Sequence, residues 1–294
     1  MTSDGYDDGF LGIPVPLPRP ADDRPTRQLS YPRFTVVLDP LRRLAAITAV
    51  NIDGATLREV PRTGDWQLDP RIPGGEQAGA AVYARNDLDR GHLVRRRDPG
   101  WGEPDDARAA TEATFFYTNA APQVNVFNQS KDLWLGLEDH VLEYADATAQ
   151  RVSVFTAPVL AEGDPEYRGI LVPRRFYKIA AWTSVDDTGM PALAAAGFVL
   201  DQSELVDGIA SAAGVMPLAG FRTFQVPIGE IEDLAGVDFG SLAAADVLPQ
   251  TTVRGATAWR PLRAPEDVIL AGGPGDYSPA RPPSRWPNDR PSPR

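Results

Sequence analysis

The stretch Leu88–Arg96 reads LDRGHLVRR and contains His92, one of only two histidines in the 294-residue chain. Residues 85–97 hold five Arg and two Asp, a local net charge of +3 in a chain whose net charge is −11. A positive segment in an acidic chain is typical of a site that binds an anionic substrate. Gly91 directly precedes His92, and a glycine there lets the backbone approach a ligand closely. We therefore take this stretch as the centre of the candidate site.

Three polar segments follow it along the chain: Tyr117–Gln123 (YTNAAPQ), Phe127–Gln129 (FNQ) and Trp134–Glu138 (WLGLE). Asn and Glu oxygens suit a hard, oxygen-preferring cation such as Mg²⁺. An imidazole is largely neutral at physiological pH and can act there as a general base. Taken singly, each segment also fits a structural role, because a histidine beside an arginine is often structural and an Asn before a helix often caps it.

Taken in order, these motifs carry a resemblance. Asp-Arg-Gly-His, Thr-Asn-x-x-Pro-Gln, Phe-Asn-Gln and Trp-x-x-Leu-Glu resemble the DNA/RNA non-specific endonucleases of the ββα-metal class, which include endonuclease G and the secreted bacterial nucleases. Arg62 with Trp66-x-x-Asp69-Pro70 is similar to the upstream arginine segment of that family. Val154–Pro158 and Val172–Lys178 are similar to its later core strands, so the resemblance covers roughly residues 30–240.

The resemblance implies which residues act on the phosphate. His92 matches the general base that takes a proton from the attacking water. Arg90 and Arg62 match arginines that bind the phosphate and stabilise its transition state. Leu142 stands where the secreted enzymes have a further arginine, and we expect Arg95 or Arg96 to replace it as a substrate-binding residue.

The resemblance also implies a divalent cation, Mg²⁺ or Mn²⁺. Asn128 matches its single direct protein ligand, and Glu138 matches a carboxylate that orders the water molecules around it. The spacing between these two residues is ten, two longer than is common in the family, which indicates an insertion before the helix. Asn119 matches a residue that supports the site by hydrogen bonding.

The remaining pattern predicts an α+β fold with a mixed or antiparallel sheet, because strands occur without regular βαβ alternation. The ββα-metal (His-Me finger) site comes from the resemblance. Two strands at Phe34–Leu38 and Ala45–Asn51 are expected to form a hairpin. The other expected elements are strands at Thr114–Thr118, Arg151–Ala157, Ile170–Ser184 and Ala195–Leu200, helices from Ser130 and over Ile228–Ala235, and a polar connector at 98–112.

Three parts are expected along the chain. Residues 1–30 are acidic and proline-rich and predict an extended arm, which packs on the domain through Phe10, Leu11, Val15 and Leu17. Residues 31–271 form the endonuclease domain. Residues 272–294 form a Pro/Arg-rich tail, in which seven prolines between Pro274 and Arg294 predict disorder.

Composition excludes several classes of site and location. The absence of Cys excludes a disulfide framework, a thiol nucleophile and Cys-based zinc sites, and two histidines exclude a three-His metal site. The first twenty residues lack a signal peptide pattern. The longest apolar stretch, Met190–Leu200, is far shorter than the ~20 residues that span a bilayer. A soluble, cytoplasmic protein with no membrane partner is expected.

The expected function is a metal-dependent, sugar-non-specific endonuclease that cleaves DNA and RNA to 5′-phosphate ends. One alternative is a catalytically inactive nuclease-fold module that binds nucleic acid or acts as a toxin-type interaction protein, although the intact His92, Arg90 and Asn128 favour the enzyme. A further alternative, an acidic hydrolase that uses Asp105–Asp106 or Asp186–Asp187, predicts no dependence on His92.

Expected partners are DNA, RNA, an inhibitor or immunity protein, and a second copy of the chain, because dimers occur in the resembling family. His140 is interpreted as non-catalytic, and Trp66, Trp134 and Trp182 as packing residues.

Overall fold

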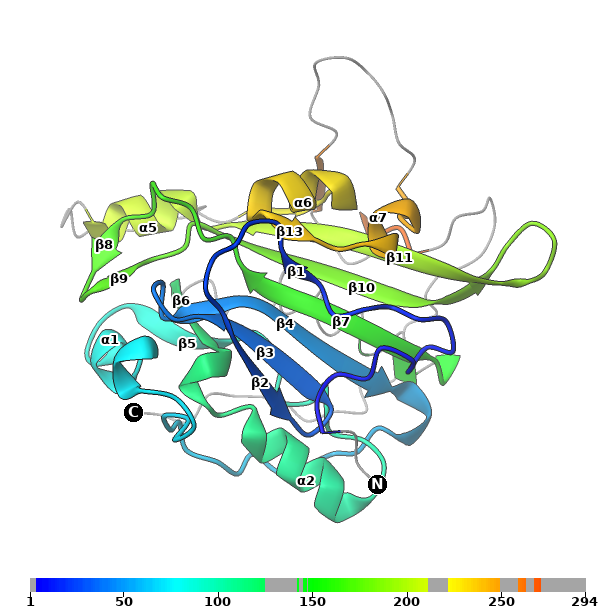
Figure 1. Cartoon of the computed structure of the whole chain (residues 1–294), viewed down its shortest axis with the longest axis horizontal. Helices are drawn as coiled ribbons and strands as arrows, with labels where there is room; N and C mark the ends of the chain where they lie inside the picture. The colour runs from blue at the N-terminus through cyan, green and yellow to red at the C-terminus, as the bar shows by residue number, and fades with distance from the viewer. Residues whose placement is uncertain are drawn as a thin grey trace.

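The computed structural model describes residues 4–124, 142, 145–146, 148–210, 222–248, 259–262 and 267–270. Its main element is an eight-stranded sheet in the order β14-β12-β11-β10-β7-β4-β3-β2, in which all neighbouring strands are antiparallel (Figure 1). In chain order these strands are β2 (Arg27–Tyr31), β3 (Phe34–Asp39), β4 (Leu44–Asp53), β7 (Arg151–Pro158), β10 (Arg175–Val185), β11 (Pro191–Asp201), β12 (Arg222–Gln225) and β14 (Arg260–Leu262). The predicted α+β class with an antiparallel sheet is confirmed.

Both faces of this sheet are buried, because apolar residues occupy both sets of alternate positions along its central strands. In β7, Val152 and Val154 point to one face, and Phe155 and Ala157 point to the other. We call the first face the site face. It is covered by α1 (Ala80–Tyr83) and by the hairpin of β5 (Leu88–His92) and β6 (Ala120–Val124).

The second face, which we call the arm face, is covered by the N-terminal segment together with α6 (Ile228–Ala235) and α7 (Ser241–Ala244) (Figure 1). In the N-terminal segment Phe10, Leu11 and Val15 are buried and Leu17 is partly buried, as the sequence predicts. The segment ends in β1 (Arg19–Pro20), which pairs with β13 (Val237–Asp238).

Several predicted elements are confirmed, and one is interrupted. The hairpin is β3–β4, the strand at residue 151 is β7, and the helix over Ile228–Ala235 is α6. The strand expected over Ile170–Ser184 is divided, because β9 (Ile170–Leu171) pairs with β8 (Glu166–Tyr167) and β10 begins only at Arg175. Pro173 lies between them and has no N–H to donate to a ladder.

The prediction for residues 98–118 is wrong. The expected connector contains a helix, α2 (Pro104–Ala113), and the expected strand at Thr114–Thr118 is a turn followed by the 3-10 helix η3 (Tyr117–Asn119). Helix α2 begins with a proline and two aspartates, which suit a first turn. Its buried face consists of Ala107, Ala110 and Thr111. These side chains are too small or polar to be recognised as an apolar stripe.

The other described elements are short. They are η1 (Gly54–Thr56), η2 (Gly74–Glu76) and α5 (Ser203–Ala210), of which α5 was not predicted. The helix expected from Ser130 and the tail at 272–294 lie outside the described residues. Among the residues that the structure describes, no helix is long and apolar enough to cross a membrane.

Candidate active site

The Asp-Arg-Gly-His motif lies on β5, where it pairs in antiparallel register with the later motif on β6. His92 faces Ala120 across the pair, and Gly91 faces Ala121. A Cβ atom added to Gly91 would lie 2.1 Å from the side chain of Gln123, which is buried. The glycine is therefore required by the packing of Gln123. Our expectation that it lets a ligand approach the backbone is corrected.

Two aromatic rings enclose His92. The ring centroid of Trp66 lies 4.5 Å from that of His92, and the ring of Phe115 stands edge-on to the imidazole at 5.0 Å. The residue as a whole is partly exposed, whereas its Nε2 atom is buried and has no hydrogen-bond partner among the described residues. His92 thus packs against two aromatic rings and is still partly exposed at the surface.

This environment keeps the imidazole neutral. Burial, followed by the positive charges of Arg62, Arg96, Arg95 and Arg90, lowers the pKa of His92 to about 3. The arginines are visible in the sequence as neighbours of His92, whereas the larger effect of burial depends on the fold. At neutral pH the ring therefore carries no charge and has a nitrogen lone pair available to accept a proton.

The four predicted arginines all lie near His92, but they differ in exposure and in their contacts. Arg62 and Arg90 are exposed, and the guanidinium of Arg62 lies 5.9 Å from the centroid of the Phe115 ring. Arg96 donates from Nη1 to the carbonyl of Val60 at 2.7 Å. Arg95 is only 8% exposed. Arg62 and Arg90 are therefore the better placed of the four to meet a phosphate from solvent.

Asn119 holds the chain that follows His92. Its Oδ1 accepts from the backbone N–H of Val94 at 2.8 Å, and its Nδ2 donates to the carbonyls of Val94 and Thr114 at 2.9 and 3.0 Å. The side chain is fully buried and all of these contacts are internal. The amide of Asn119 is thereby committed to the backbone and is not a free metal ligand.

The predicted metal-binding residues Asn128 and Glu138 lie outside the described residues, as does His140. Within the part of the chain that the structure describes, no group of three or more His, Asp or Glu side chains is placed to hold a metal ion. Asp186, from one of the aspartate pairs, caps a tight turn by accepting from the backbone N–H of Thr188 at 2.8 Å.

Two residues of the site were missed from the sequence. Trp66 was interpreted as a packing residue and Phe115 as part of a strand, but both contact the imidazole. The available signal was the position of Trp66 within the arginine segment, four residues after Arg62. Phe115 gave no such signal, because its contact depends on the turn after α2.

The α+β fold thus places a neutral histidine near four arginines at the end of the β5–β6 hairpin. Residues 18–246 match the family model of the DNA/RNA non-specific endonucleases, and the chain belongs to that family.

The curated relatives of the chain include one uncharacterised protein and two named nucleases. The chain is 36% identical over 293 residues to the uncharacterised protein y4fB of Sinorhizobium fredii, covering 90% of this chain but only 42% of y4fB. It is 23% identical to a nuclease of Nostoc sp. over 70% of this chain and 69% of that protein. It is 27% identical to human mitochondrial endonuclease G over 60% of this chain and 57% of that protein.

A solved structure of an EndoG/EndoGI complex aligns with a TM-score of 0.53 and 20% identity, covering 72% of this chain and 85% of that chain. At this identity the match supports the fold.

Proposed function

We propose that this chain is a divalent-metal-dependent endonuclease that hydrolyses DNA and RNA without distinguishing the sugar and leaves 5′-phosphate ends. The observation that carries the proposal is His92, an imidazole held neutral between Trp66 and Phe115 among exposed arginines. Phosphodiester hydrolysis needs a base for the attacking water and positive charge for the transition state. The site offers both.

In this mechanism His92 accepts the proton of the attacking water. A bound phosphate offsets the positive charge of the nearby arginines, which raises the pKa of His92 from its low value in the free site towards that of a useful base. Arg62 and Arg90 orient the phosphate and stabilise the charge that develops on its oxygens. Asn119 fixes the backbone that carries the imidazole.

Asn128 is the residue that we propose as the direct ligand of Mg²⁺ or Mn²⁺, with Glu138 acting through ordered water. When bound, the cation neutralises phosphate charge and stabilises the departing oxygen. Because the amide of Asn119 is engaged with the backbone of Val94 and Thr114, we do not propose it as a further ligand.

A cleavage assay tests the proposal. The purified chain is incubated with supercoiled plasmid, single-stranded DNA and RNA, each with Mg²⁺ and with chelator, and the product ends are analysed. We expect cleavage of all three substrates with Mg²⁺ only, and 5′-phosphate ends. Binding without cleavage under every metal condition would favour the inactive nucleic-acid-binding module instead.

An inhibitor or immunity protein is the partner that we propose for this activity. A non-specific nuclease that acts in the cytoplasm endangers its own cell, and the aligned structure is a complex of EndoG with EndoGI in which EndoG is inhibited. Isolation of the chain from its native host should therefore recover a second chain that suppresses cleavage. A fully active preparation without any other chain would contradict this partner.

A further inference from the structure

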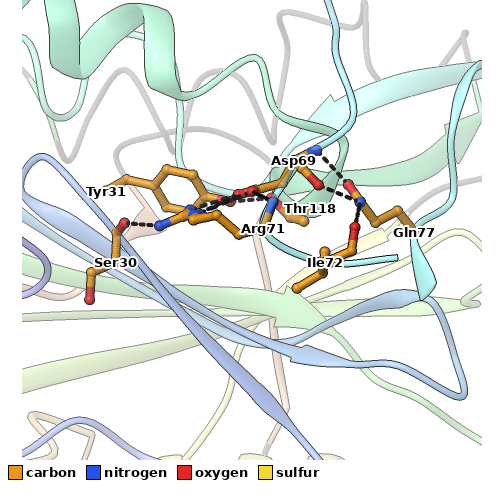
Figure 2. A network of polar contacts seen from close by, with 7 residues as sticks. All are labelled: Ser30, Tyr31, Asp69, Arg71, Ile72, Gln77 and Thr118. Atoms are coloured by element: carbon orange, nitrogen blue, oxygen red, sulfur yellow. Dashed lines mark hydrogen bonds and ion pairs between the residues drawn. The ribbon is translucent and has the colours of Figure 1, made fainter. Parts of the chain in front are cut away.

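A buried polar network lies beside the site and joins three segments that are distant in the sequence (Figure 2). The Oη atom of Tyr31, on β2, lies 2.6 Å from Oδ2 of Asp69 and 2.6 Å from Oγ1 of Thr118, on η3. Arg71 donates to both carboxylate oxygens of Asp69, from Nη2 at 2.6 Å and from Nε at 3.0 Å. Tyr31, Asp69 and Thr118 are each at most 3% exposed.

The protonation states in this network are well defined. Burial and the hydrogen bond with Asp69 raise the pKa of Tyr31, so its hydroxyl stays protonated and donates to the carboxylate. Burial alone would raise the pKa of Asp69, but hydrogen bonds from Arg71 and Tyr31 outweigh it and hold that pKa below its usual value. Because the Tyr31 hydroxyl already donates to Asp69, the Thr118 hydroxyl must donate to Oη of Tyr31.

The network also fixes the backbone at Asp69. The backbone N–H of Asp69 donates to Oε1 of Gln77 at 2.8 Å, and Nε2 of Gln77 donates back to the carbonyl of Asp69 at 2.9 Å. Asp69 is therefore held through both its side chain and its main chain, so its position relative to β2 and η3 is set by polar groups.

Asp69 and Thr118 are each close in sequence to a residue that contacts His92 or holds the chain after it. Trp66, which packs on the imidazole, lies three residues before Asp69. Gln67, one of the two residues between them, exchanges backbone hydrogen bonds with Phe115 and Tyr117 at 3.1 and 2.9 Å. On the other side, Thr118 directly precedes Asn119, whose amide clamps Val94 two residues after His92.

We propose that the Tyr31 hydroxyl and the Asp69 carboxylate are positioning groups for the cleavage reaction. They hold Trp66 on one side of His92 and Asn119 on the other, and neither needs to touch the substrate. This inference rests on the proposed function, in which His92 is the general base.

The choice of polar groups supports a positioning role. A phenylalanine at position 31 would fill almost the same volume without the need to satisfy a hydroxyl, and buried ionic groups are often neutral or costly for stability. A satisfied polar network instead specifies one arrangement of the segments that it joins. That property matters at a catalytic base, because a displacement of about 1 Å can reduce the rate by about 100-fold.

The test compares Tyr31→Phe with a matched control, Tyr177→Phe. Tyr177 is also fully buried in the sheet, but it points to the arm face and donates from Oη to the carbonyl of Ala46 at 3.0 Å. Each variant loses one buried hydroxyl. Cleavage of a defined oligonucleotide is measured at a temperature where circular dichroism shows all proteins folded, and kcat and KM are determined separately.

We expect Tyr31→Phe to lower kcat by about tenfold with KM within about twofold of wild type, because the base is displaced while the phosphate-binding arginines remain. Tyr177→Phe should leave both constants unchanged. Thr118→Val, which removes only the last hydroxyl of the network, should lower kcat in the same direction and keeps the test valid if Tyr31→Phe does not fold.

The outcomes separate this inference from the proposed function. Wild-type protein that does not cleave with Mg²⁺ contradicts the proposed function itself. Wild-type protein that cleaves, together with an unchanged kcat in Tyr31→Phe and Thr118→Val, overturns only the positioning role. Equal losses in Tyr31→Phe and Tyr177→Phe would also overturn it, because the effect would then reflect general destabilisation.

Discussion

The two faces of the central sheet are covered in different ways. On the site face, the chain around His92 is held by side chains that bond to the backbone, such as Asn119 on Val94 and Gln77 on Asp69. On the arm face, the N-terminal segment is held largely by buried apolar side chains such as Phe10 and Val15. Apolar contacts tolerate repacking, whereas a buried polar contact is made or lost as a unit. Activity should therefore depend on individual polar groups of the site face, and stability on both faces.

The largest effect is expected from His92→Ala, which removes the group that the site face is built to hold. Cleavage should fall by about 10²–10⁴-fold, the usual contribution of a general base, while nucleic-acid binding is largely retained. Cleavage and binding are measured in parallel. His140→Ala, which removes the only other histidine of the chain, is the control and should change neither. Similar cleavage by both variants would exclude His92 as the base.

Two buried asparagines, Asn119 on the site face and Asn51 on the arm face, allow a direct comparison of the two faces. Asn119→Ala leaves three buried backbone groups of Val94 and Thr114 without partners, which should cost about 3 kcal/mol of unfolding free energy. Because the chain after His92 is then released, cleavage should also fall by at least about tenfold. Denaturant unfolding gives the first quantity, and cleavage of the folded variant gives the second.

Asn51→Ala is the matched control on the arm face. Asn51 accepts from the backbone N–H of Asp7 at 2.7 Å and donates to Oγ of Ser153 at 3.1 Å. Its loss should lower stability by about 1–2 kcal/mol without changing the cleavage rate of the folded protein. A comparable loss of activity in both variants would show that the two faces do not differ as we describe.

The features that could be predicted from the sequence depend on residues that are close together in the chain. His92 and Arg90 lie within one short motif, so their proximity needed no knowledge of the fold. The apolar, β-branched runs of β3, β4 and β7 gave the strands, because such runs are a local property of the sequence. The contacts of Asn119 with Val94 were not predictable in detail, since they require the register between β5 and β6.

The features that were missed depend on packing between distant segments. Helix α2 buries alanines, which carry little hydropathy signal, so its segment was predicted to be a connector. Trp66 and Phe115 meet His92 only because a loop and a turn lie against the hairpin. The low pKa of His92 follows mainly from that enclosure, which cannot be read from the sequence, and the neighbouring arginines make the smaller contribution.

On the arm face, Phe10→Ala is expected to affect stability alone. Phe10 is 8% exposed, its ring lies 5.6 Å from that of Trp101, and the guanidinium of Arg151 lies 5.1 Å from its centroid. Removal of this buried ring should lower the unfolding free energy by about 3 kcal/mol. Cleavage by the folded variant should equal that of wild type. A reduced rate at a temperature where the variant is folded would indicate that the arm face also supports the site.

The smallest effect is expected from pH, and it tests the enclosure of His92 directly. At about pH 5, only about one thirtieth of an imidazole with an ordinary pKa would be neutral, and cleavage would fall in proportion to this fraction. Since burial and the neighbouring arginines lower the pKa of His92 to about 3, the free enzyme should keep its base neutral over this range. Between about pH 5 and 7, kcat/KM, which reports the free enzyme, should therefore change by less than about threefold.

Unlike kcat/KM, the stability of the folded chain should depend on pH in this range. The unfolded chain binds a proton at His92 below about pH 6.5, whereas the folded chain does so only near pH 3, so the unfolded state takes up more protons in between. The free energy of unfolding should thus decrease as the pH falls through that interval, and His92→Gln, which has no titrating ring, should lose that part of the decrease.

Trp66→Ala should expose the imidazole of His92 to water and so raise its pKa, which moves the acid limb of kcat/KM towards about pH 6. An acid limb already near pH 6.5 in the wild type, unchanged in Trp66→Ala, would show that the aromatic rings do not control the protonation of His92.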